Sequence, residues 1–91
     1  MTTDRATEVL ADIYLTGDTD SREERGAEGH LWRAAEHVES HDWSRADDSL
    51  DAAYHALGAE PPDATANDLA LGRHPIQVEA DRQYREEMGE D

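Results

Sequence analysis

The sequence predicts a small all-α protein, an antiparallel bundle of three to five helices built around a helical hairpin. Three observations lead to this fold class. Apolar residues recur at intervals of three and four, the period of a helix that buries one face. Cap residues and helix terminators separate the periodic segments. Strict alternation of apolar and polar residues is missing, as are runs of β-branched residues, so no strand is expected.

The first helix is expected over residues 3–15. Its apolar side chains fall on one stripe, and Gly17 stands where a C′ glycine commonly ends a helix. The stripe comprises Ala6, Val9, Leu10, Ile13 and Tyr14. A polar loop rich in turn-forming residues then leads to the next helix.

The second helix is expected over residues 21–41. Ser21 and Glu24 have the S-x-x-E spacing of a capping box, which satisfies free backbone N–H groups at a helix start. Gly26 and Gly29 each cost about 1 kcal/mol relative to Ala inside a helix, which indicates close packing or a frayed first turn. The apolar stripe comprises Ala27, Leu31, Ala34, Ala35 and Val38.

The third helix is expected over residues 44–57, because the Pro61-Pro62 pair prevents a helix from continuing much further. Its stripe comprises Ala46, Leu50, Ala53, Tyr54 and Leu57. A short fourth helix is expected over residues 64–71, where Gly72 ends it.

The last helix is expected over residues 75–87, since proline suits the first helical position and Pro75 stands there. Its apolar residues form a seam at intervals of four: Ile76, Ala80, Tyr84 and Met88. The seam is narrow, so this helix is expected to pack at the edge of the bundle or against a partner. Residues 1–91 are expected to form one domain.

The charge of the chain limits its ligands. The formal net charge is −15, with 23 acidic residues against 8 basic ones. Binding nucleic acid depends on neutralising phosphates, so no direct nucleic-acid ligand is expected, and anionic membrane surfaces are equally disfavoured. Without cysteine there are no disulfides and no thiolate metal sites. The sequence shows no signal peptide and no run of about 18 apolar residues, which favours a cytoplasmic location.

All basic residues are arginine, and lysine and phenylalanine are both absent. Together with the strong acidity, this composition resembles the small proteins of salt-in halophiles, above all the haloarchaea. An acidic protein from a high-GC bacterium or a phage is the alternative. Screening at molar salt removes the self-repulsion that such a charge creates, because the Debye length falls to about 3 Å.

Residues 27–61 resemble a single tetratricopeptide-type helical hairpin. The second half of that pattern is carried by the sequence "HDW" at residues 41–43, followed by Ala46, Leu50 and Ala53. Small residues in this family let two helices approach closely, while larger ones fill the gap between them. The resemblance implies protein–protein binding. Alanine-rich antiparallel helices produce the same pattern, so a generic helical hairpin is the alternative.

Three histidines are candidate metal ligands: His30, His37 and His41. On one helix they fall on the same side, and His37 and His41, four residues apart, suit one divalent ion such as Zn²⁺. His30 lies roughly 10 Å along the axis from His37, so a complete site needs ligands from another helix or a second subunit, with His30 or His74 as donors. The alternatives are polar residues at a helix boundary and a pH-dependent interface.

No catalytic constellation is recognisable, so we do not expect an enzyme. The glycines lack the spacing of a phosphate-binding loop, and no nucleophile elbow occurs. Asp47, Asp48 and Asp51 form an acidic cluster, which in such a composition is expected to be a solvated face. No cofactor is expected outside the metal hypothesis.

The remaining expectation is a non-catalytic protein–protein interaction module: an adaptor, an accessory subunit or a self-associating helical protein. Its partner is another protein or a second copy, and the candidate contact residues are Trp32, Ile76, Tyr84 and Met88. Trp32 lies off the main stripe of its helix, and aromatic residues dominate the energetics of interfaces. An acidic inhibitor that mimics nucleic acid is a further alternative, for which binding should weaken steeply with salt.

Overall fold

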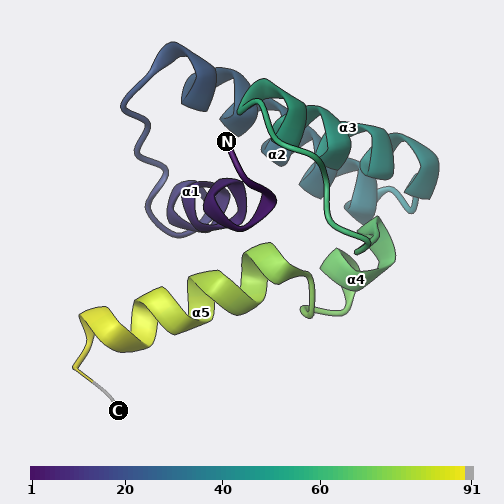
Figure 1. Cartoon of the computed structure of the whole chain (residues 1–91). Helices are drawn as coiled ribbons and strands as arrows, with labels where there is room; N and C mark the ends of the chain where they lie inside the picture. Colours follow the sequence, from purple (N-terminus) through teal and green to yellow (C-terminus); the bar gives the residue numbers. More distant parts are fainter. Residues whose placement is uncertain (90–91) are drawn as a thin grey trace.

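Helices make up most of the chain (Figure 1). The computed structural model describes residues 1–89. Five helices occur in that range: α1 (Thr3–Thr16), α2 (Arg22–Glu39), α3 (Trp43–Ala56), α4 (Ala66–Ala70) and α5 (Pro75–Glu87). The same range holds no strand, which confirms the all-α class predicted from the periodicity.

The ends of α2 and α3 differ from the expected ones by one or two residues. α2 ends at Glu39 rather than at residue 41, because His41 has a φ of 59° and leaves the helical conformation. α3 begins at Trp43, because the Asp42 carboxylate accepts a hydrogen bond from the Arg45 N–H at 3.4 Å. Aspartate is a favoured N-cap residue, since its oxygen satisfies one of the free N–H groups of the first turn.

α2 and α3 form an antiparallel hairpin and make the most extensive helix–helix contact of the described fold (Figure 1). Alanine dominates its buried surface, which lets the two backbones approach closely. More than half of the buried apolar residues of the whole core are alanines: Ala6, Ala11, Ala27, Ala34, Ala46, Ala53, Ala59, Ala66 and Ala80. The larger ones fill the remaining space: Leu10, Ile13, Leu31, Leu50, Tyr54, Leu57, Leu69 and Ile76.

α1 connects the hairpin to α5. It contacts α2 and α3 on one side, and its contact with α5 is the second most extensive in the fold. The Gln83 side chain donates a hydrogen bond from Nε2 to the Glu8 carbonyl at 3.2 Å across the α1–α5 contact. The start of α1 is tied to the segment after α3, where Thr3 Oγ1 donates to the Glu60 carbonyl at 2.8 Å.

Tyr54 is the largest side chain in the core and brings a hydroxyl with it. Thr7 Oγ1 donates to the Thr3 carbonyl at 2.9 Å, so its single proton is in use. The Tyr54 hydroxyl, 2.7 Å from Thr7 Oγ1, is therefore the donor in the contact between them. This chain of hydrogen bonds joins α3 to α1. Burial raises the pKa of the Tyr54 hydroxyl above its usual 10.0.

The described chain is compact. Its radius of gyration is 12.3 Å, close to the roughly 12 Å expected for a folded chain of this length. Among residues 1–89, no helix combines the length and the apolar character needed to cross a membrane.

Candidate interaction surface

Trp32 projects from the face of α2 that is turned away from the buried stripe. Its side chain is 40% exposed. The Tyr14 ring of α1 stacks against the indole, with ring centroids 6.2 Å apart and an interplanar angle of 26°. The Tyr14 ring, itself 37% exposed, covers part of the indole and leaves the rest open to solvent. Partly exposed aromatic residues are common anchors in protein interfaces.

Two of the other predicted contact residues, Ile76 and Tyr84, lie on α5, and Met88 directly follows its last residue. The prediction that Ile76 lies on the contact surface is wrong, because its side chain is fully buried. The first half of the α5 seam packs into the core, and Ala80 is buried with Ile76. Tyr84 and Met88 are 49% and 61% exposed. The core therefore covers the first half of the seam, Ile76 and Ala80, and leaves the second half, Tyr84 and Met88, exposed.

Gly26 and Gly29 lie in the exposed part of α2 beside Trp32. Neither expectation drawn from them is correct. The first turn is not frayed, since α2 begins at Arg22 and Ser21 Oγ accepts a hydrogen bond from the Glu24 N–H at 3.1 Å. Close packing is absent too, because a Cβ added at either glycine would have no heavy atom within 4 Å.

The three candidate ligands His30, His37 and His41 do not form a metal site within the described chain. His30 and His37 are half-buried on α2, and His41 is exposed beyond its end. The prediction that His37 and His41 share a helix face is wrong, because α2 ends at Glu39 and His41 lies in the turn that follows. No group of three or more His, Cys, Asp or Glu side chains within residues 1–89 is placed to hold a metal ion. The metal hypothesis thus requires ligands from a second subunit.

His41 has a structural part in the turn between α2 and α3. Its N–H donates to the Val38 carbonyl at 3.0 Å, and the Asp42 N–H donates to the His37 carbonyl at 2.8 Å. These two bonds form a Schellman motif, with His41 in the left-handed position that glycine usually fills. The His41 ring stacks on Trp43 with centroids 5.7 Å apart. The second tryptophan therefore belongs to the hairpin turn.

His74 is the titratable residue whose role the sequence reasoning missed. It is 1% exposed and caps α5, with Nδ1 accepting from the Ile76 N–H at 3.1 Å. The backbone N–H of His74 donates to Gln77 Oε1 at 3.1 Å, and Gln77 Nε2 donates to the Leu69 carbonyl at 2.9 Å. Burial lowers the pKa of His74 below 6.5, while the charge of Asp68 opposes the shift. The Pro75 and Gln77 spacing was the available signal for this cap.

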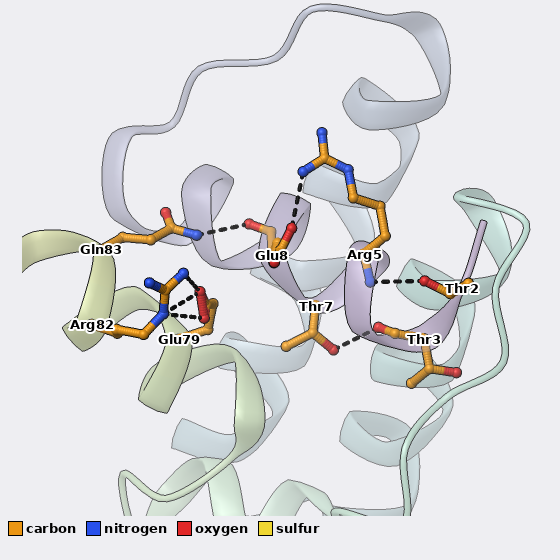
Figure 2. A network of polar contacts seen from close by, with 8 residues as sticks. All are labelled: Thr2, Thr3, Arg5, Thr7, Glu8, Glu79, Arg82 and Gln83. Atoms are coloured by element: carbon orange, nitrogen blue, oxygen red, sulfur yellow. Dashed lines mark hydrogen bonds and ion pairs between the residues drawn. The ribbon is translucent and has the colours of Figure 1, made fainter. Parts of the chain in front are cut away.

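A groove of about 470 Å³ lies between α1 and α5, and Figure 2 shows the polar contacts around it. Thr7, Glu8, Val78 and Arg82 are among its lining residues, and no predicted site residue lines it. The Arg82 guanidinium hydrogen-bonds the Glu79 carboxylate and holds the pKa of that carboxyl below its usual range. Of the charged residues that line this groove, Glu79 and Arg82 pair with each other and Glu8 pairs with Arg5.

One member of the acidic cluster on α3 has a structural role. Asp47 Oδ1 accepts a hydrogen bond from the Ala66 N–H at 2.6 Å, at the first residue of α4. The interpretation of Asp47 as part of a purely solvated face is therefore wrong. Asp48 and Asp51 are exposed as expected.

Comparison with protein-family models, with curated proteins and with solved structures finds no match for this chain. Any functional conclusion therefore depends on the geometry described above.

Proposed function

We propose that this chain is a non-catalytic protein-binding module whose contact surface is centred on Trp32. The observation that carries the proposal is the Tyr14–Trp32 stack, because it fixes a large aromatic side chain that remains 40% exposed. Burying an apolar side chain of this size against a partner contributes roughly 1.5–3 kcal/mol. A supported aromatic ring loses little conformational entropy on binding, so more of that contribution is retained.

Trp43 provides a matched comparison within the same chain. It is 41% exposed and also stacks on one aromatic ring, that of His41. It lies two residues after His41, whose positive φ forms the hairpin turn. The fold accounts for Trp43 as part of that turn, whereas Trp32 lies in the middle of α2, where its contact is the Tyr14 ring and 40% of its surface stays exposed.

The setting that we propose for this module is the cytoplasm of a cell with high internal salt. The net charge of −15 and the exclusive use of arginine support this setting. At molar salt, apolar burial is maintained or strengthened while long-range repulsion is screened. A contact centred on an aromatic side chain suits such a solvent.

Retention of a partner by tryptophan variants tests the proposal. The tagged chain, its Trp32→Ala variant and its Trp43→Ala variant are incubated with extract of the native cell, and retained proteins are quantified by mass spectrometry. We expect one discrete partner, retained by the wild type and by Trp43→Ala, and reduced at least about tenfold by Trp32→Ala, the effect of 1.4 kcal/mol at an interface hot spot. Equal retention by both variants, or no discrete partner, would contradict the proposal.

A further inference from the structure

Six residues of α2 form one exposed surface, which we define as the outer face of α2: Arg22, Arg25, Gly26, Gly29, Trp32 and Arg33. Their spacings of three, four and seven place them on the same side of a helix. None of them is acidic, although 23 of the 91 residues of the chain are acidic. Glu36 is exposed on the same side of α2, three residues after Arg33 and four after Trp32, and Glu28 lies half-buried at the edge of this face, so the three arginines outnumber the carboxylates there.

The arginines of the outer face differ from the other five. Ion pairs with carboxylates engage each of these five: Arg5, Arg45, Arg73, Arg82 and Arg85. Among residues 1–89, no carboxylate lies within ion-pairing distance of the three on the outer face. The three unpaired arginines therefore share a helix face with the exposed tryptophan: Arg33 is adjacent to Trp32, and Arg22 lies about 15 Å away along the helix axis.

Packing inside the described chain does not explain the two glycines of this face. Each destabilises a helix interior by roughly 0.5–1 kcal/mol relative to alanine, and each has open space where a Cβ would stand. Without side chains, this strip of α2 permits another backbone to approach closely. Gly29 lies one turn before Trp32, so the strip and the indole border the same space.

We propose that the outer face of α2 binds an acidic amphipathic helix of a partner protein. Carboxylates of that helix pair with the three arginines, its backbone crosses Gly26 and Gly29, and its apolar side chains cover Trp32. Guanidinium groups bind carboxylates through two parallel hydrogen bonds, which gives this pairing geometric specificity as well as charge. The inference rests on the proposed function and names the chemistry of the partner.

Charge complementarity selects this occupant over two others. Nucleic acid presents a long run of phosphates, which three arginines cannot neutralise in a chain where 23 of 91 residues are acidic. A second copy that uses the same face brings the same three arginines into the contact. A single helix brings only a few carboxylates and needs only the local cationic surface.

A photo-crosslinking residue at position 36 tests the inference in the native cell. Glu36 is exposed and follows Trp32 by one helical turn, so the added side chain borders the proposed contact without filling the strip at Gly26 and Gly29. The cross-linked peptide of the partner is then sequenced by mass spectrometry. We expect a segment with Asp or Glu at helical spacing. A basic or neutral segment, nucleic acid or a second copy of this chain would overturn the inference.

Charge variants separate the inference from the proposed function. The double variant Arg25→Glu with Arg33→Glu reverses the charge at both positions. It is expected to lower the cross-link yield about tenfold, equivalent to 1.4 kcal/mol. The matched control is Arg45→Glu with Arg85→Glu, which makes the same change in net charge at exposed sites on α3 and α5 and should leave the yield within about twofold. Circular dichroism confirms that each variant is folded.

Three outcomes separate failure of the acidic-helix inference from failure of protein binding. If Trp32→Ala abolishes the protein adduct and the reversal at Arg25 and Arg33 does not, protein binding stands and the acidic partner is wrong. If the reversal and its control lower the yield equally, the effect reflects net charge and the inference is also wrong. If position 36 gives no protein adduct, the inference fails, and the proposed function fails with it if Trp32→Ala retains every partner of the wild type.

Discussion

The α2–α3 hairpin and helix α5 are attached to the fold by different interactions. The hairpin buries small apolar residues along its whole contact, with Leu31 and Leu50 between the helices. α5 buries only Ile76 and Ala80, and polar groups at His74 and Gln83 fix it to the remainder of the chain. Apolar periodicity alone therefore describes the hairpin well, whereas α5 depends on a cap that a hydropathy pattern does not show.

The largest effect is expected from the centre of the hairpin. Leu31→Ala removes a side chain that is 1% exposed, and such core truncations lower the free energy of unfolding by about 2–5 kcal/mol. Urea denaturation followed by circular dichroism measures the change. A loss below about 1 kcal/mol would show that the hairpin is not the main source of stability.

A smaller and local effect is expected at the start of α5. His74→Ala removes the acceptor for the Ile76 N–H, and loss of an N-cap costs about 1 kcal/mol. Hydrogen exchange should accelerate in α5 before it does in the hairpin. His74→Asn is the control, because asparagine caps helices well and its exchange rates should stay near those of the wild type. Uniform acceleration in all helices would remove the distinction between the two regions.

The same residue gives α5 a pH dependence. Because burial lowers the pKa of His74 below 6.5, the unfolded chain binds this proton at a higher pH than the folded chain does. The free energy of unfolding should therefore fall as the pH drops from about 6.5 towards 5. The lowered pKa values of Asp68 and Glu79 act at more acidic pH. His74→Asn should flatten the profile between pH 5 and 6.5, and an unchanged slope would be a contradiction.

The smallest effect should have the opposite sign. Gly29→Ala lies in the exposed part of α2 with open space at the added Cβ, so it should raise the free energy of unfolding by roughly 0.5–1 kcal/mol. Thermal unfolding measures the gain. A destabilising result would mean that the fold itself requires this glycine.

The sequence predicted the elements that apolar spacing and caps define. The helix over residues 3–15, the Ser21 cap and the proline start of α5 all have local signals, and the structure has helices at these places. The turn at His41 was missed because histidine rarely adopts a positive φ, so the His37–His41 pair was placed on one helix. Periodicity alone also gave no means of telling which half of the α5 seam would be covered.

For the candidate surface, the sequence singled out Trp32 but not its surroundings. The Tyr14 stack joins residues on different helices, which requires the tertiary fold. Gly26 and Gly29 were noticed and given the wrong reason, because only the structure shows that nothing packs against them. The unpaired state of the neighbouring arginines likewise depends on where the carboxylates of the folded chain lie.

Fluorine NMR of the chain labelled with 5-fluorotryptophan tests the central claim most directly. The chain holds two tryptophans, so the spectrum has two resonances even in unlabelled native extract, and a Trp43→Phe variant assigns them. We predict that adding the extract shifts or broadens the Trp32 resonance and leaves that of Trp43 nearly unchanged. A change confined to Trp43, or two unchanged resonances, would contradict protein binding through Trp32.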